Sequence, residues 1–177
     1  RLVGPEHPPL VIAEIGINHG GSLDVAMQMV DAAFQAGVTH IKHQTHIPEE
    51  EMSGAARQVV PGNDSRSIFE VIASCSLSQE EERQLKEYVE SRGLTFLSTP
   101  FSLAAVERLG ALDVAAVKVG SGECNNIPLL QEVAKLSRPV ILSTGMNDME
   151  AVDRAVALFR NASVPVAVLH TTNLYPT

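Results

Sequence analysis

The chain has 177 residues, a length typical of one domain, and 45% of them are hydrophobic, which supports a sizeable core and excludes intrinsic disorder. A net charge of −8 and an aromatic content of 4% argue against a nucleic-acid-binding surface, and the negative charge also argues against binding to an anionic membrane. No apolar run approaches the roughly 18 residues that span a membrane. Two cysteines, Cys75 and Cys124, are too few for a disulfide framework and favour a cytoplasmic protein.

Short apolar strands alternate with helices along most of the chain, and this alternation is typical of a parallel α/β sheet. The segment 46–77 departs from the alternation and offers only a short helical stretch near 68–73, and so long an excursion is usually functional. Ser22 is predicted to cap one helix, and Ser78 with Glu81 has the spacing of a capping box. Strands are predicted at 11–18, 40–45, 95–99, 115–121, 139–144 and 166–172, and helices at 23–36, 78–93, 102–109, 127–136 and 148–162.

Two architectures fit this order of elements, a doubly wound open sheet and a (β/α)₈ barrel. Polar residues share one face of the predicted strands, as Glu14, Gly16 and Asn18 do in the first and Lys42 and Gln44 in the second. An open sheet covered by helices on both sides needs apolar residues on both faces, so the pattern favours a barrel. We therefore expect an α/β fold of the (β/α)₈ TIM-barrel type, to which residues 1–177 contribute about six βα units of a longer protein.

Lys42 and Lys118 are two of only four lysines, and each lies within a predicted strand among apolar neighbours. A lysine is costly to bury there, so either its amine reaches solvent at the strand end or it has a function. A single desolvated lysine could form a Schiff base with a carbonyl substrate. A pair could instead hold a phosphate or a carboxylate as point charges. The residues alone leave these alternatives open.

Hydroxyl groups recur where the predicted strands end. Thr99 and Ser143 end the third and fifth strands, and Ser121 lies in a glycine-punctuated run that follows Lys118. Such ends let hydroxyls and backbone N–H groups approach an anion. With the two lysines, they predict a cup that binds an oxyanion.

The acidic and histidine side chains admit structural as well as functional roles. Glu14 could form an ion pair with Lys42, or it could act as a general acid or base or bind a sugar hydroxyl. Glu123 could simply be a favourable charge near a helix start. Candidates for metal ligands lie among His19, His40, His43, His46 and His170, but no compact metal-binding spacing occurs, and most of these histidines are interpreted as structural.

Six short motifs occur in a fixed order, and together they resemble the N-acetylneuraminate (sialic acid) synthase family in its bacterial form. The resemblance spans nearly the whole chain, from residue 11 to residue 177. The motifs are Ala13-Glu-Ile-Gly-Ile-Asn-His19, Lys42-His-Gln44, Ser98-Thr-Pro-Phe101, Lys118-Val-Gly-Ser-Gly-Glu-Cys-Asn-Asn126, Ser143-Thr-Gly-Met146 and Thr171-Thr-Asn-Leu-Tyr-Pro176.

This resemblance implies a barrel followed by a small antifreeze-like domain, in a domain-swapped homodimer. It implies condensation of phosphoenolpyruvate with N-acetylmannosamine, in which C3 attacks the open-chain aldehyde, water held by a metal attacks C2, and phosphate leaves. The implied cofactor is a divalent metal, Mn²⁺ with Mg²⁺ or Co²⁺ as alternatives, whose ligands belong to the family's C-terminal part. The lysines are then anion holders rather than Schiff-base residues, and residues 1–177 alone are expected to be inactive.

The resemblance also assigns roles by motif. Glu14 and Glu123 are implied to be catalytic, and Gln44 and Asn63 to contact the sugar. The residues implied to surround phosphoenolpyruvate are Lys42, Thr99, Lys118, Ser121, Ser143, Asn173 and Tyr175.

Two other functions compete with this one. A legionaminic or pseudaminic acid synthase of the same family would share the barrel motifs and differ in the sugar pocket. A non-catalytic sugar-phosphate-binding module would bind the anion and condense nothing.

Overall fold

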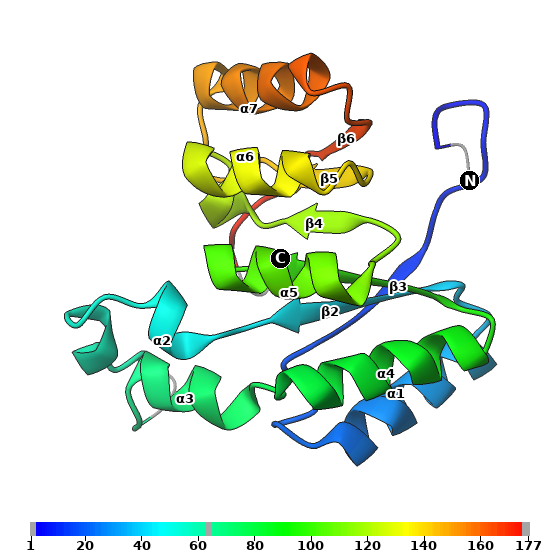
Figure 1. Ribbon diagram of the computed structural model, residues 1–177, viewed down its shortest axis with the longest axis vertical. Helices are drawn as coiled ribbons and strands as arrows, with labels where there is room; N and C mark the ends of the chain where they lie inside the picture. The colour runs from blue at the N-terminus through cyan, green and yellow to red at the C-terminus, as the bar shows by residue number, and fades with distance from the viewer. Residues whose placement is uncertain (1–2, 63–64, 175–177) are drawn as a thin grey trace.

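The computed structural model describes residues 3–62 and 65–174. Its six strands form one parallel sheet in the order β1-β2-β3-β4-β5-β6, which is also their order in the chain (Figure 1). A doubly wound sheet reverses its strand order part-way, whereas a barrel adds its strands in sequence. The strands are β1 (Ile12–Gly16), β2 (His40–Thr45), β3 (Thr95–Pro100), β4 (Val117–Val119), β5 (Val140–Ser143) and β6 (Val166–Leu169).

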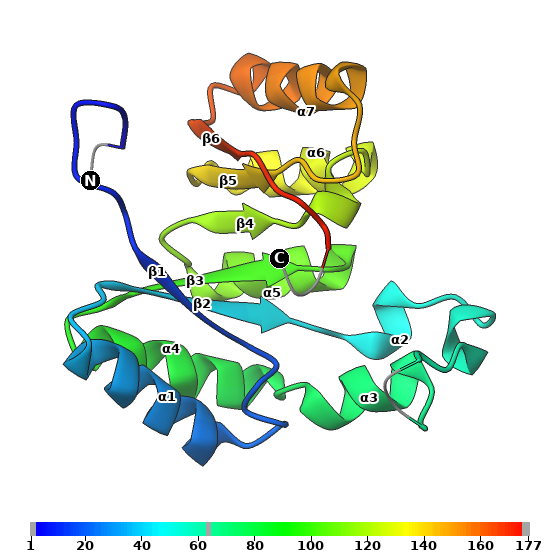
Figure 2. The same cartoon turned by 180° about the vertical axis from the view of Figure 1, so that it is seen from behind.

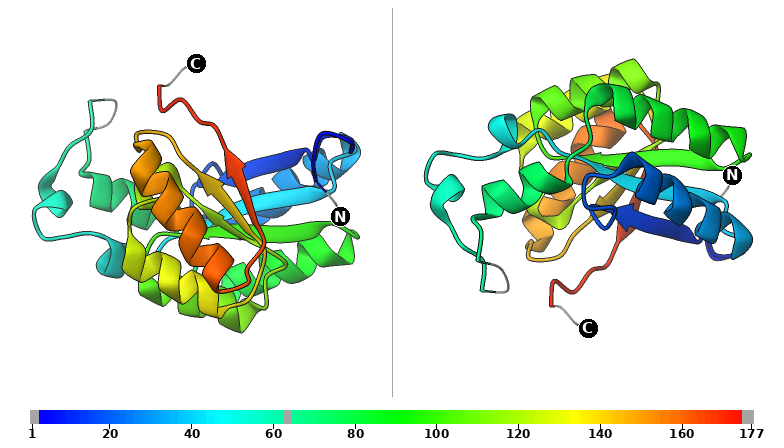
Figure 3. Two further views of the ribbon diagram at one scale, coloured as in Figure 1. Left: turned by 90° about the horizontal axis from the view of Figure 1, so that it is seen from above. Right: turned by 90° about the horizontal axis from the view of Figure 1, so that it is seen from below.

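Helices lie around the outside of the curved sheet, as the views from above and below in Figure 3 show. The other face of the sheet, which would be the interior of a barrel, carries no helix within residues 3–62 and 65–174. The prediction of consecutive βα units of a (β/α)₈ barrel is therefore confirmed. The principal helices are α1 (Leu23–Gln35), α4 (Gln79–Ser91), α5 (Leu103–Leu112), α6 (Ile127–Lys135) and α7 (Met149–Asn161).

The alternation of side chains along the strands explains the two layers. In β2, Ile41 and His43 are buried toward the helices, while Lys42 lies on the opposite face. In β4, Val117 and Val119 are buried in the same way. The apolar core therefore fills the space between sheet and helices, and the polar face is left for a site. Fully buried core residues on the helices include Ala26, Val30, Leu85, Val89, Leu109, Leu130 and Phe159.

The helix starts follow the predicted signals. The Ser22 side chain accepts a hydrogen bond from the Val25 backbone N–H, so it caps α1 as expected. Ser78 and Glu81 form the predicted capping box at the start of α4.

Three strands end two or three residues earlier at their carboxyl ends than the sequence pattern indicates. β1 ends at Gly16, where φ is +45° and the pairing with β2 shifts register, so Asn18 lies beyond the strand and does not extend its polar face. β4 ends before a 3₁₀ turn, η2 (Ser121–Glu123), and β6 ends at Leu169. In each case the polar residues leave the hydrogen-bonded ladder and form loops at the carboxyl end.

The excursion between β2 and α4 extends past the carboxyl end of β2 (Figures 1 and 2). The short helix predicted near 68–73 is present as α3, and Ser67 with Glu70 forms its capping box. No helix within residues 3–62 and 65–174 is long and apolar enough to cross a membrane. The elements of the excursion are α2 (Pro48–Glu51), η1 (Ala56–Gln58) and α3 (Ile68–Cys75).

Candidate active site

A cavity of about 450 Å³ opens on the polar face of the sheet, at the carboxyl ends of the strands. In barrel enzymes this end of the strands carries the active site. The segment that follows β6 runs along the carboxyl ends of β5 and β4, and it contributes to the cavity wall (Figure 2). The lining residues are Glu14, Lys42, Gln44, Thr99, Phe101, Lys118, Gly120, Ser121, Ser143, Thr171, Thr172 and Asn173.

Most of the predicted site residues meet in this cavity. Glu123 does not line it, because its carboxylate accepts a hydrogen bond of 2.6 Å from Asn126 Nδ2 beside it. Asn63 and Tyr175 lie outside the described residues. The predicted residues that the structure does bring together are Glu14, Lys42, Gln44, Thr99, Lys118, Ser121, Ser143 and Asn173.

Glu14 and Lys42 form an ion pair across neighbouring strands. They are register partners in the parallel pairing of β1 with β2, so their side chains leave the sheet side by side. The Lys42 side chain is 16% exposed and that of Glu14 is 40% exposed, so the pair lies open to the cavity rather than in the core. The structural and functional interpretations of Glu14 are therefore compatible.

Lys118 provides the second positive charge. Burial, with a smaller contribution from the nearby Lys42 charge, lowers the pKa of its ammonium group to about 8 against the opposing effect of Glu14. Its Nζ donates a hydrogen bond of 2.8 Å to the Val119 carbonyl. Because Glu14 balances one of the two lysines, the pair leaves one positive charge for an anionic ligand to neutralise.

Thr99 presents a polar atom that lacks a partner. Its Oγ1 is buried and has no hydrogen bond to any of the described residues, yet Thr99 lines the cavity. Buried hydroxyls are almost always hydrogen-bonded, so an unpaired one at a cavity wall suits a bound ligand.

A small hydroxyl network shapes the far wall. Ser121 Oγ and Thr171 Oγ1 lie 3.1 Å apart, and both accept hydrogen bonds from the backbone N–H of Gly145, at 3.1 and 2.6 Å. A Cβ at Gly145 would lie 2.9 Å from Thr171 Oγ1 and would collide with Asn173. Glycine at this position therefore lets the loop after β5 approach the segment after β6 closely.

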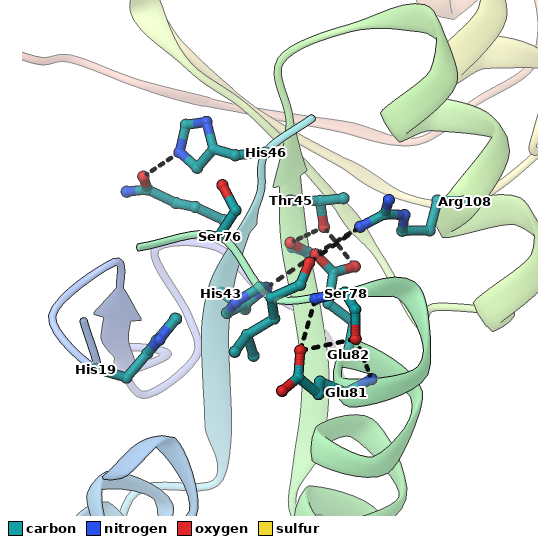
Figure 4. A network of polar contacts seen from close by, with 12 residues as sticks. His19, His43, Thr45, His46, Ser76, Ser78, Glu81, Glu82 and Arg108 are labelled. Carbon is teal, nitrogen blue, oxygen red and sulfur yellow. Dashed lines mark hydrogen bonds and ion pairs between the residues drawn. The ribbon is translucent and has the colours of Figure 1, made fainter. Parts of the chain in front are cut away.

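A buried polar network lies on the other side of the sheet, toward α4 (Figure 4). The His43 ring stacks between His19 and Phe96, with ring centroids 5.4 and 6.0 Å apart, and burial lowers its pKa to about 3. Burial also raises the pKa of Glu82 to about 7, against the opposing charge of Arg108. His43 thus fits the structural interpretation, behind the cavity rather than in it.

Within this network, hydroxyl groups tie Glu82 to the strands. Thr45 of β2 donates to Glu82 Oε2 at 3.3 Å, and its Oγ1 lies 2.8 Å from Ser98 Oγ of β3. Of the Ser98–Thr99 pair, only Thr99 therefore faces the cavity.

A hollow of about 550 Å³ between α4 and α5 offers a weaker site. Its charged groups already pair along α4, where Arg83 contacts both Glu80 and Glu87. No group of three or more potential metal ligands of the His, Cys, Asp or Glu type occurs in residues 3–62 and 65–174. The described residues therefore do not fit a metal site by themselves.

Fold and cavity together define a barrel-type protein with a polar cavity, lined by two lysines, at the carboxyl ends of its strands. The model of the NeuB family matches residues 29–177, and the chain belongs to this family. The resemblance to the sialic acid synthase family is thereby confirmed.

Individual relatives agree with this assignment. N-acetylneuraminate-9-phosphate synthase of Homo sapiens is 33% identical over 99% of this chain and 50% of that protein. N,N'-diacetyllegionaminic acid synthase of Legionella pneumophila is 34% identical over 94% of this chain and 49% of that protein. The crystal structure of N-acetylneuraminic acid synthetase from Leptospira borgpetersenii in complex with citrate has a TM-score of 0.84 and 29% identity, over 97% of this chain and 56% of that one. The chain spans about half the length of the curated relatives it matches.

Sequence reasoning assigned no role to several residues that line or support the cavity. Phe101 and Thr171 lie inside two of the quoted motifs, so the motifs themselves were the available signal. Asn147 was not singled out, although its Nδ2 donates to the carbonyls of Ser121 and Gly145 at 2.8 and 2.7 Å and joins two loops of the wall.

Proposed function

We propose that this chain forms the anion-binding part of an enzyme that condenses phosphoenolpyruvate with N-acetylmannosamine to give N-acetylneuraminate and phosphate. One observation carries the proposal: Lys42 and Lys118, from two different strands, converge on one cavity with an unpaired hydroxyl, that of Thr99. Phosphoenolpyruvate has a carboxylate and a phosphate, and lysines with hydroxyl donors are suited to both groups.

The chain's own residues then have distinct tasks. Lys42 and Lys118 hold the two anionic groups, and Ser121 and Ser143 donate hydrogen bonds to their oxygens. The C2–C3 double bond attacks the sugar aldehyde carbon, and the aldehyde oxygen takes a proton. Water adds at C2 and loses one proton, which leaves a hydroxyl group on C2. The C–O bond to phosphate then breaks as this hydroxyl forms the C2=O double bond and gives its proton to the departing phosphate. Glu14 lies beside Lys42, where it can move a proton at the aldehyde oxygen or at the water.

The test offers phosphoenolpyruvate with a panel of amino sugars to the full-length protein and measures phosphate release. Release with N-acetylmannosamine supports the proposal. Release only with a precursor of legionaminic or pseudaminic acid assigns the chain to one of those synthases instead. Binding of phosphoenolpyruvate without phosphate release from any sugar would overturn the enzyme proposal in favour of a non-catalytic binding module.

The metal and the dimer belong to the same proposal. We propose that the full-length protein is a homodimer that uses Mn²⁺, or Mg²⁺ or Co²⁺ in its place, with ligands outside the described residues. A chelator should abolish phosphate release and added Mn²⁺ should restore it, and sedimentation should give the mass of a dimer. Full activity in the presence of the chelator would contradict the metal requirement.

A further inference from the structure

We propose that His46, held by Glu51, is a positioning residue that fixes the side-chain amide of Gln44 with its N–H₂ group available at the cavity for an oxygen of the sugar. The inference rests on the proposed function for the identity of the ligand. The contacts themselves come from the structure, in which they link α2, the helix that carries Glu51, to Gln44 in the cavity wall.

Both nitrogens of the His46 ring have partners. Nδ1 lies 2.9 and 3.0 Å from the two carboxylate oxygens of Glu51, and Nε2 lies 3.0 Å from Gln44 Oε1 (His46 is labelled in Figure 4). A carboxylate only accepts hydrogen bonds, so Nδ1 donates to Glu51. Nε2 faces an oxygen as well, so it donates to Gln44.

The side chains of His46 and Glu51 are buried, and the His46 ring is fixed by its neighbours. His46 is 6% exposed and the Glu51 side chain 5%. The His46 ring stacks on Phe101, with 4.2 Å between ring centroids and 10° between the planes, and Phe101 itself lines the cavity. The ring therefore cannot turn away without losing both the ion pair and the stack.

The orientation of the Gln44 amide follows from this contact. Because Oε1 accepts from His46, the N–H₂ group is directed away from the ring. A Cβ at Gly16 would lie 3.2 Å from Gln44 Nε2 and 2.8 Å from Glu14 Oε1, so the amide nitrogen and the Glu14 carboxylate flank the same glycine at the cavity. Gln44 thus offers donors, and its ligand is an acceptor such as a hydroxyl or carbonyl oxygen of the sugar.

Glu51 does not contact Gln44 directly but controls the orientation of its amide through the His46 ring. If Nδ1 lost its acceptor, the ring could rotate, or it could keep a hydrogen on only one of its two nitrogens. A bare Nε2 would accept from the amide N–H₂, and the Gln44 amide would turn its oxygen toward the cavity. The sugar would then meet an acceptor in place of a donor.

The first test is a double-mutant cycle in the full-length protein with Glu51→Ala, Gln44→Ala and both together. Loss of one oriented hydrogen bond should raise the KM for the sugar about tenfold in Glu51→Ala. The KM for phosphoenolpyruvate should change less than twofold, and the double variant should be no worse than Gln44→Ala. Glu51→Gln keeps an acceptor for Nδ1 and should restore most of the affinity. Glu50→Ala, an exposed position on the same helix, is the matched control.

The second test does not need turnover. In protein labelled with ¹⁵N-glutamine, the Gln44 side-chain amide signal, identified by its loss in Gln44→Ala, should move in Glu51→Ala and stay in place in Glu50→Ala. An unmoved signal would overturn the positioning role, as would effects of Glu51→Ala and Gln44→Ala that simply add. If no sugar is condensed but the signal moves, the proposed function fails while the positioning role stands.

Discussion

Lys118 differs from an ordinary surface lysine, because burial brings its pKa to about 8. The ammonium group therefore loses its charge as pH rises through about 8, and the affinity for an anion should fall over the same range. We predict that the KM for phosphoenolpyruvate rises above pH 8 in the wild-type protein. A guanidinium stays charged throughout, so Lys118→Arg should give a flatter profile. The measurement is KM between pH 7 and 9.5, with the exposed Lys135→Arg as control.

Lys118→Met addresses the charge itself. A hydrogen bond to a charged group contributes about 1.5–3 kcal/mol, so this variant should bind phosphoenolpyruvate about ten- to a hundredfold more weakly at pH 7. An unchanged KM, or a substrate adduct trapped on Lys118 with borohydride, would refute the role of anion holder.

The Glu14 carboxylate is paired with Lys42 at the cavity, and substitution distinguishes a role in the reaction from a role only in folding. Glu14→Gln keeps the shape and removes the charge. A partly exposed ion pair adds little to stability, so the melting temperature should change little. The kcat should fall at least about a hundredfold, the low end for a positioned acid or base. Near-full activity with a much lower melting temperature would show instead that Glu14 only holds Lys42.

At the scale of elements, the network around Glu82 ties α4 to β2 and makes stability depend on pH. Burial raises the Glu82 pKa from 4.5 to about 7, so the folded protein holds a proton that the unfolded chain releases between these values. The stabilisation is complete below pH 4.5 and is lost as pH rises through about 7, an effect on the order of 3 kcal/mol.

His43 has the opposite dependence. Its pKa falls from 6.5 to about 3, so its contribution is present above pH 6.5 and is lost as pH falls. Between pH 4.5 and 6.5, Glu82 makes the free energy of unfolding fall with pH while His43 makes it rise. From pH 6.5 to about 7, only the decrease caused by Glu82 remains.

We predict that Glu82→Gln, which keeps the shape of the side chain, gains stability relative to the wild type as pH rises from 5 to 8. The measurement is urea unfolding at both pH values, and the difference between them is the readout, since effects of the substitution that do not depend on ionisation shift both values alike. Glu150→Gln, an exposed partner of Arg154, is the control. An equal stability difference at pH 5 and 8 would show that Glu82 does not titrate in this range.

The helix starts and strand ends show which features of the fold could be predicted from the sequence. Local signals correctly predicted that Ser22 and Ser78 cap helices and that Lys42 lies on the polar face of its strand. Each of these features depends only on residues within one helical turn or one strand.

The ends of β1 and β6 were missed. At β1, Gly16 takes a positive φ and the chain turns, with the Asn18 N–H donating to the Ile15 carbonyl. After β6, Thr171 contacts Ser121 and Gly145, which are distant in sequence.

Within the site, the motifs led to most of the cavity lining. The bond from His46 to Gln44 was not foreseen, since it depends on how the chain turns from β2 into α2. No periodicity in the sequence reports that contact.

At the scale of the whole molecule, the sheet has two edges within the described residues, β1 and β6. Val168 and Leu169 on β6 are 48% and 41% exposed, an apolar stretch beside unpaired backbone groups. Exposed apolar edges of this kind pair with other chains. In a closed barrel, further strands would cover both edges, and the relatives extend to about twice the length of this chain.

We therefore predict that residues 1–177 produced alone self-associate at micromolar concentration, whereas the full-length protein gives one defined species. Light scattering coupled to size exclusion measures this directly. Val168→Lys places a charge on the exposed edge and should reduce association of the isolated chain, because pairing with another chain would bury that charge. Lys135→Glu changes a residue on the outer face of α6 and should leave association unchanged. A monomeric, stably folded isolated chain would show that the β6 edge needs no cover.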